Sequence, residues 1–476
     1  MFATTTRQLK PNCLGFTELL SQNVAVISPT MTAALIVPVM YGNTGDWSWL
    51  SYALGTVMLL FVAFNLNQFA KRSASSGSMY AYICRGLGLT AGAIGGWALI
   101  WAYLGIAMAG VTGFTIFAGK LCSMMGFNPP PILLFAVCIG ISWFCAWTNV
   151  NLSARTMLLC EAISVAFILV LCFIVLAHHG FAVDTPQFDT KTVPWSSIGL
   201  GVVVAIFSLV GFEAATAFGD EAKNPLKTVP RSIYVSLVIA GIFFVFVTYV
   251  EILGIRGYST TLDKIDQPLN ILAQLVKIPV LQIPLSLGAM LSFFALNLSC
   301  ISAGGRIIYA LGRHGILPPA TASAHEKNET PHVAVTIMAL LSFAVPTAAL
   351  IFGHVALLDC FNDVGTCAAF GFVVAYGLVS AAAPAYLKKI DELTAKDWAG
   401  CIASLVLLAV PAVGSVYPVP APPVNYFPYA FLLYLAVGIA WILAFYRREP
   451  SASVKIREDL DQSHARHQSM GMAAGE

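Results

Sequence analysis

The sequence carries little charge. Asp, Glu, Lys and Arg make up 10% of its 476 residues, whereas a typical soluble domain contains about 25%. Hydrophobic residues make up 58%, and the mean hydropathy is +0.80. Because so few polar side chains cannot cover a surface that faces water, the composition excludes an ordinary soluble domain. It indicates an integral membrane protein in contact with the lipid bilayer.

The residue patterns of several other protein classes are missing too. The eleven cysteines include no CxxC pair and no metal-ligand spacing, so we interpret them as small apolar packing residues and expect neither a metal nor a cofactor. The eight histidines lie mostly in loops and tails without a partner in an apolar run, a pattern that does not indicate an enzyme. The net charge of +2 gives no indication of a nucleic-acid partner.

The apolar residues are grouped in long runs. A helix needs about 20 residues to cross roughly 30 Å of hydrocarbon, whereas barrel strands alternate in pieces of about ten. The runs therefore predict an all-α integral membrane protein with twelve transmembrane helices. They lie at about 15–40, 48–69, 89–119, 131–149, 155–177, 197–218, 232–254, 282–311, 333–353, 357–382, 398–417 and 427–446.

Lys and Arg are distributed unequally between the loops. If the N-terminus is cytoplasmic, 20 of the 25 fall on the inner side, and the outer side keeps only Lys120, Lys191, Arg256, Lys264 and Lys277. This asymmetry supports an even number of spans. No cleavable signal peptide is visible, and the polar segment after the last span is expected to be a disordered tail. We therefore predict a multi-pass protein of the cell membrane with both termini cytoplasmic.

The first apolar run is interrupted near its middle. The stretch NVAVISPTMTAALIVP places Ser28, Pro29, Thr30 and Thr32 within an otherwise apolar helix. Pro29 lacks a backbone donor and clashes with the preceding turn, so a break is expected here. Taken alone, a simple kink at Pro29 is the commoner arrangement.

The sixth run is interrupted at a comparable depth, at Ser208, Gly211 and Glu213. Gly211 either permits an irregular backbone or is a packing glycine. A charge such as that of Glu213 costs at least ~2.5 kcal/mol near the bilayer centre. Broken backbone at membrane depth is tolerated only where it is buried in protein or lines a cavity. Two interrupted spans, five apart and in corresponding positions, predict an inverted-repeat transporter whose site lies between them.

Four stretches resemble one family. GFEAATAFGDEAKNPLKTVPRSI is similar to the signature of the amino acid-polyamine-organocation permease superfamily, in which a Gly-aromatic-Glu element of helix six precedes an inner E-x-x-N-P loop. SPTMTAAL in helix one, SSGSMYAYI after helix two and RIIYALGRHGILP after helix eight agree with that family. The resemblance covers about residues 15–446.

The resemblance implies a LeuT-like fold of five plus five helices in inverted repeat, followed by two extra helices. The expected organisation is a cytoplasmic N-terminal tail at 1–14, a transporter core of helices one to ten at 15–382, helices eleven and twelve at 383–446, and a cytoplasmic C-terminal tail at 447–476.

Substrate in such permeases lies at the two breaks, which implies a binding site here at Ser28, Pro29, Thr30, Met31, Thr32, Phe207, Ser208, Val210 and Gly211. N-termini of half-helices present free N–H groups to a carboxylate, and carbonyls at opposing helix ends accept from an ammonium. Phe207 matches the position of an aromatic lid in the family. The alternative is an ordinary Phe that faces the core or lipid.

Glu213 is the expected proton-coupling residue. A carboxylate whose protonation changes when its surroundings open to water can couple proton binding to alternating access, and the resemblance suggests the same role. The alternative is a Glu213 that stays hydrogen-bonded and stabilises the break in helix six.

Helix eight and helix five hold further polar residues. Asn297, Ser299 and Ser302 either complete a sodium site with helix-one carbonyls or hold helices together. Some members of the family replace the sodium with a lysine in helix five, where this chain has Ser164, a departure that puts its ion coupling in doubt. Glu161, in the same helix, is either an inner-vestibule group or part of a structural pair.

These observations predict a secondary active transporter of amino acids or related amines, with H+ as the coupling ion in a symporter. A polyamine or amine transporter, an exchanger and a Na+-coupled carrier are the alternatives. A sensor built on a permease scaffold fits less well, as does a channel, because a single buried Glu does not supply pore rings. No Lys or Arg occupies the middle of a span, which argues against a dianionic substrate.

Overall fold

The structure is a computed structural model that describes residues 9–460 except 76, 194, 418 and 420. The described residues form helices and one isolated β-bridge, without a β-sheet. The α-helices are α1 (Phe16–Ile27), α2 (Pro29–Met31), α3 (Val37–Thr44), α4 (Ser48–Ala70), α5 (Met79–Leu87), α6 (Leu89–Met124), α7 (Pro131–Thr148), α8 (Val150–His178), α9 (Trp195–Leu209), α10 (Pro225–Ile255), α11 (Pro268–Leu275), α12 (Gln282–Arg313), α13 (His332–Phe352), α14 (Leu357–Lys389), α15 (Ala395–Gly414) and α16 (Phe427–Arg448).

The prediction of an all-helical membrane protein is confirmed. Within the described residues, eleven helical stretches are long and apolar enough to cross a membrane. The first of them, Phe16–Ala70, is 55 residues long, which exceeds twice the ~20 residues that one crossing needs. It contains both the first and the second predicted run, so the number of twelve crossings stays a prediction.

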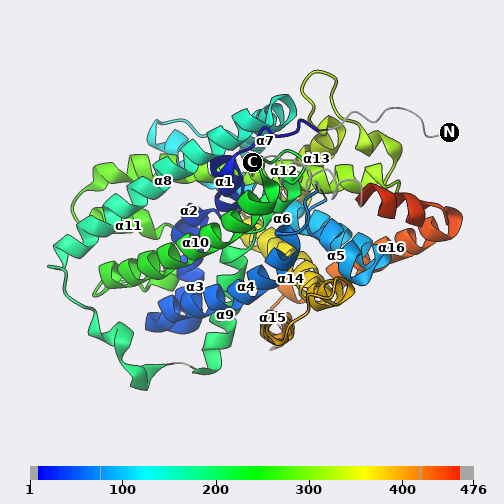
Figure 1. The fold of residues 1–476 in the computed structure, drawn as a ribbon. Helices are drawn as coiled ribbons and strands as arrows, with labels where there is room; N and C mark the ends of the chain where they lie inside the picture. The colour runs from blue at the N-terminus through cyan, green and yellow to red at the C-terminus, as the bar shows by residue number, and fades with distance from the viewer. Residues whose placement is uncertain (1–8, 76, 194, 418, 420, 461–476) are drawn as a thin grey trace.

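The core of the bundle is built around α6, which packs along both α12 and α14. Small residues of α6 allow this close approach: a Cβ on Gly110 would lie 2.9 Å from the backbone nitrogen of Asn297 in α12. By contrast, α16 is mostly exposed, as its apolar composition permits in lipid. Figure 1 shows α16, in orange and red, at the edge of the molecule and α1 and α12 near its centre.

Helix one is broken at Ser28, within the stretch that the sequence predicts. Ser28 has a φ of 48°, a left-handed conformation that ends α1 at Ile27. Pro29 then opens α2, which has three residues, and a π-helical stretch at Thr32–Ile36 leads into α3. Proline suits this position because the first residue of a helix needs no N–H donor.

Helix six is also broken, and the two breaks touch. After α9 ends at Leu209, Gly211 has a φ of +95°, and the chain continues as a 3-10 helix at Ala214–Phe218. A Cβ on Gly211 would lie 2.1 Å from the Cγ1 atom of Val26 in α1. Both the conformation and the close contact therefore require glycine here.

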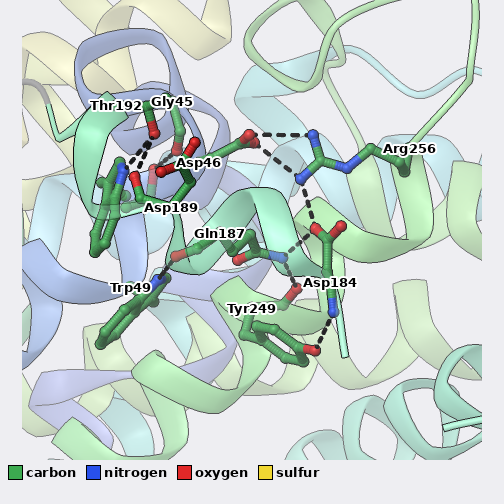
Figure 2. A network of polar contacts seen from close by, with 11 residues as sticks. Gly45, Asp46, Trp49, Asp184, Gln187, Asp189, Thr192, Tyr249 and Arg256 are labelled. Carbon is green, nitrogen blue, oxygen red and sulfur yellow. Dashed lines mark hydrogen bonds and ion pairs between the residues drawn. The ribbon is translucent and has the colours of Figure 1, made fainter. Parts of the chain in front are cut away.

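An ion-pair network joins the helix ends on the side predicted to be outer (Figure 2). Arg256, directly after α10, pairs with Asp46 at 3.1 Å and with Asp184 at 2.5 Å. Asp184 lies in the connection between α8 and α9 and also accepts a hydrogen bond from Gln187 at 2.8 Å. Gln187 donates to the carbonyl of Tyr249 in α10 at 3.1 Å. The connection is thus fixed to α10 and to the turn between α3 and α4.

The prediction of a disordered tail after α16 is wrong for the part that the structure describes. Residues 452–460 form a helix, and Ala452, Ile456 and Leu460 are buried on one face of it. Asp459 forms an ion pair with Arg313 at the end of α12. Apolar residues spaced four apart form a stripe on one face of a helix. The prediction missed this stripe because it relied on the polar composition of the whole segment. Residues 461–476 lie outside the described part of the chain.

Candidate functional site

Glu213 accepts three hydrogen bonds at the break in helix six. The hydroxyl of Tyr103 in α6 donates to Oε1 at 3.0 Å. The hydroxyl of Tyr376 in α14 donates to Oε2 at 2.6 Å, and the backbone N–H of Gly211 donates to Oε2 at 3.1 Å. The Glu213 side chain is 0% exposed. The carboxylate therefore does not face lipid and instead joins the break to α6 and α14.

The sequence patterns single out neither Tyr103 nor Tyr376. A tyrosine in an apolar run is also common at the level of the lipid headgroups. In the structure both side chains are fully buried. A buried tyrosine hydroxyl needs a hydrogen-bond partner, and this requirement is the signal that points to a polar group nearby. The tyrosines are separated from Glu213 by 110 and 163 residues along the chain, so the pairing is visible only in the fold.

The break in helix one is held by hydroxyl pairs. The Ser28 hydroxyl lies 3.1 Å from that of Ser292 in α12. The Thr30 hydroxyl lies 2.5 Å from that of Ser164 in α8. All four side chains are buried. The segment predicted to bind substrate is therefore anchored to α8 and α12 by its side chains. The backbone N–H groups of Ser28, Met31 and Thr32 donate to carbonyls of helix one itself.

Phe207 differs from the other residues predicted to bind substrate, because it is only partly buried. Its ring packs on α14, where a Cβ on Gly365 would lie 2.5 Å from the Phe207 Cζ atom. Phe207 thus contacts the helix that also supplies Tyr376. The other predicted residues not described so far are buried around the breaks; they are Pro29, Met31, Thr32, Ser208 and Val210.

The three polar residues predicted in helix eight lie in α12 and face different neighbours. The Asn297 side chain donates to the carbonyl of Ala107 in α6 at 2.8 Å. The Ser299 hydroxyl donates to the carbonyl of Gln22 in α1 at 3.1 Å. Both contacts hold helices together, as in the second of the two alternatives predicted for these residues. The buried Ser302 hydroxyl has no partner among the described residues.

A buried ion pair lies on the side of the breaks that is predicted to be inner. Arg306 of α12 donates two hydrogen bonds to Glu221, which follows the 3-10 helix of the sixth span. The guanidinium also lies over the ring of Phe218, 4.0 Å from its centroid. The chain before α1 pairs with the same loop, through an isolated parallel bridge between Leu14 and Ala222. Residues 1–8 of the predicted N-terminal tail lie outside the described residues.

The sequence profile of a family described as "Amino acid permease" matches residues 23–455 of the chain. The chain belongs to the amino acid permease family. This family consists of transporters, not of enzymes, and the resemblance noted in the sequence is confirmed.

Individual relatives carry different substrates. The branched-chain amino acid permease BcaP of Lactococcus lactis is 27% identical over 375 residues, which cover 75% of this chain and 79% of that protein. The low-affinity putrescine importer PlaP of Escherichia coli is 23% identical over 305 residues, which cover 61% of this chain and 65% of that protein. The chain is thus similar both to an amino acid permease and to an amine importer.

A solved structure of an Na+-coupled sialic acid symporter, in a substrate-bound outward-open state, has a similar fold. The TM-score is 0.54, and the alignment covers 88% of this chain and 94% of the symporter at 14% identity. At this identity the comparison shows the fold alone, a LeuT-like transporter fold.

Proposed function

We propose that this chain moves amino acids or related amines across the cell membrane by alternating access, as a proton-coupled symporter. The observation that carries the proposal is the position of Glu213, a buried carboxylate at a helix break that is held by hydroxyls from two other helices. An ionised carboxylate only accepts hydrogen bonds, whereas a protonated one also donates. Proton binding at Glu213 therefore changes how the break packs against α6 and α14.

The proposed substrate site lies between the two breaks, at Ser28–Thr32 and Phe207–Gly211. An α-amino acid carries a carboxylate beside an ammonium, and these groups match the free N–H groups and free carbonyls of interrupted helices. Because the middle of the spans contains no Lys or Arg, backbone N–H groups are the main ligands for a carboxylate. Branched-chain amino acids are the first candidates, because one relative is a permease for them.

The proposed architecture has twelve spans. The first ten form a core of two inverted repeats at 15–382, and the last two lie at 383–446, with tails at 1–14 and 447–476. Both termini are cytoplasmic in this proposal. The contact between the breaks in helices one and six supports it, because in this arrangement the two broken helices are the first helices of the two halves.

Two observations favour specific alternatives. The putrescine importer among the relatives favours an amine substrate. The Na+-coupled symporter with a similar fold favours sodium as the coupling ion, with α12 as one wall of the ion site. An exchanger needs no net ion movement and is tested by the same assay.

Uptake into proteoliposomes tests the proposal. Labelled leucine and putrescine are offered with an inward proton gradient, an inward sodium gradient, or unlabelled substrate inside. We expect accumulation of leucine with the proton gradient, and its loss in Glu213→Gln, which keeps the shape of the side chain but cannot titrate. If Glu213→Gln accumulates leucine with the pH dependence of the wild type, proton coupling through Glu213 is wrong. Accumulation driven by sodium alone supports the second alternative.

A further inference from the structure

Glu161 in α8 is a buried carboxylate that receives no hydrogen bond from the described residues. Its side chain is 2% exposed, and neither carboxylate oxygen has a hydrogen-bond partner among the described residues. Glu213, by contrast, receives three donors. An ionised carboxylate that is buried without a donor or a cation is strongly unfavourable. Glu161 therefore needs a proton or a cation that the neighbouring side chains do not supply.

The carboxylate lies where α8, α12 and the break in helix one meet. The backbone N–H of Thr30 and the side chain of Ser292 lie nearby, but neither forms a hydrogen bond to it. Thr30 is the second residue of α2, so its N–H has no carbonyl partner within that helix. The helices approach closely here, because a Cβ on Gly288 in α12 would lie 3.0 Å from the Cα atom of Ser164 in α8.

The hydroxyls around Glu161 are already paired with one another. Ser292 lies 3.1 Å from Ser28, and Thr30 lies 2.5 Å from Ser164. A hard metal cation needs several oxygen ligands at once. A proton needs only one carboxylate oxygen and turns the group into a hydrogen-bond donor. The surroundings of Glu161 therefore suit a proton better than a metal ion.

No charged side chain of the described residues compensates Glu161. The titratable side chain that interacts with it is Cys160, its neighbour on α8. None of the other charged or histidine side chains on α8 or on the described helices packed against it acts on the carboxylate. Those side chains are Glu18 of α1, Arg155 and His178 of α8, Lys227, Arg231 and Glu251 of α10, and Arg306 and Arg313 of α12.

We propose that Glu161 is a second proton-binding carboxylate of the transport cycle. The inference rests on the proposed proton-coupled transport and adds a second titrating group to it. In the closed arrangement the proton is bonded to one carboxylate oxygen. When helix one moves away from α8, water reaches the carboxylate, the O–H bond breaks and the proton passes to that water. Closure takes up a proton from water again, so opening of helix one and proton release are linked.

Glu251 in α10 offers a matched control. It is 0% exposed, and neither of its carboxylate oxygens has a partner among the described residues. It interacts with Cys172 of α8 and with Tyr52 of α4, whose hydroxyl lies 3.4 Å from that of Ser208, and not with the groups of helix one that surround Glu161. Glu251 therefore shows what the loss of a buried carboxyl group does when the group does not lie beside the break in helix one.

Infrared spectroscopy of the purified protein tests the inference without a substrate. A protonated carboxylic acid has a C=O stretching band that is separate from the bands of carboxylates and amides. In sodium-free buffer at neutral pH, we expect Glu161→Gln to lose part of this band and Glu161→Asp to keep it with a shifted pH midpoint. The inference is overturned if neither variant changes the band, or if sodium chloride removes the Glu161 contribution, which would assign the site to a metal ion.

Transport gives the second readout, which is the ratio of leucine accumulation driven by a pH gradient to leucine exchange. We expect Glu161→Gln to lower this ratio at least about fivefold, the low end of the range for coupled sites. Glu251→Gln should leave the ratio unchanged. An unchanged ratio in Glu161→Gln overturns the inference while the proposed function stands. If the wild type moves neither leucine nor putrescine, the proposed function fails, and the infrared result still decides whether Glu161 holds a proton.

Discussion

Arg306 of α12 and Glu221 of the loop before α10 form an ion pair that is almost completely buried, with side-chain exposures of 1% and 0%. The guanidinium donates two hydrogen bonds to the carboxylate. The bond from Nη2 to Oε1 is 2.8 Å long. The pair therefore joins α12 to the loop that connects the sixth span with α10.

Removing one partner of this pair should strongly destabilise the protein. Glu221→Gln leaves the Arg306 charge buried without compensation, for which about 3–5 kcal/mol is expected. The measurement is the change in the free energy of unfolding of the purified protein. Glu392→Gln is the control, because Glu392 pairs with Arg72 but is 55% exposed, and an exposed pair contributes at most about 1 kcal/mol. Equal effects of the two substitutions would contradict the prediction.

Tyr376→Phe should weaken the packing of helix six against α14. The substitution removes the 2.6 Å hydrogen bond to Glu213, and bonds to charged groups contribute about 1.5–3 kcal/mol. The control is Tyr434→Phe on the peripheral helix α16. It removes a 2.9 Å hydrogen bond to the carbonyl of Trp97 in α6, for which about 0.5–1.5 kcal/mol is expected. Thermal unfolding compares the two variants, and leucine uptake should fall in Tyr376→Phe alone. A variant Tyr376→Phe with full stability and uptake would show that the bond is dispensable.

Gly211→Ala should disrupt the contact between the two breaks. The new methyl group would meet Val26 at 2.1 Å and would occupy a residue whose φ is +95°, so a loss of about 1–3 kcal/mol is expected from overpacking alone. Gly140→Ala is the control, because its Cβ meets open space in α7 and alanine favours the helix by about 0.5–1 kcal/mol. The melting temperature should fall for the first variant and hold or rise for the second. The reverse order would refute the close contact.

The C-terminal segment at 452–460 should loosen in acid. The His314 imidazole lies 3.0 Å from Asp459 through Nε2 and 2.6 Å from the Tyr80 hydroxyl through Nδ1. Burial lowers the pKa of His314. Burial by itself raises the pKa of Asp459, but the hydrogen bond with His314 and the charge of Arg313 lower it overall. Compared with a state in which both groups are exposed to water, the docked arrangement therefore binds fewer protons.

With this sign, docking is complete above the ordinary His pKa of about 6.5 and weakens as the pH falls below it. Between pH ~7.5 and ~5.5 the docking equilibrium should fall by up to about tenfold. Hydrogen exchange of the backbone amides of 452–460, corrected for intrinsic rates, measures the change. Asp459→Asn should exchange faster than the wild type at both values. Equal protection of the wild type across this range would rule out the His314 contribution.

The twelve-span arrangement predicts which loops each side of the membrane can reach. Single cysteines beside Lys191 and Lys264 should react with a membrane-impermeant thiol reagent from outside. Cysteines beside Lys227 and Lys388 should react only from inside, because their loops carry the excess of positive charge. Labelling of right-side-out and inverted vesicles provides the comparison. A loop that reacts from the opposite side would break the arrangement.

Local signals in the sequence are enough to predict the class of the protein and, for several helices, where they end or break. The predicted runs at 131–149 and 427–446 correspond to α7 (Pro131–Thr148) and α16 (Phe427–Arg448). This succeeds because a helix in lipid satisfies its backbone hydrogen bonds within its own segment, so the signal is local. The breaks are local as well, since Pro29 and Gly211 act through their own backbone restrictions and freedoms.

The contacts of the buried polar groups, by contrast, depend on how the helices pack. Glu213 meets Tyr103 and Tyr376, and Glu221 meets Arg306, across separations of 110, 163 and 85 residues. Spans in lipid are apolar on every side, so hydrophobic periodicity does not tell which faces of two helices meet. The same reason separates Glu213, which the packing supplies with three donors, from Glu161, whose carboxylate receives no hydrogen bond within the described part of the chain.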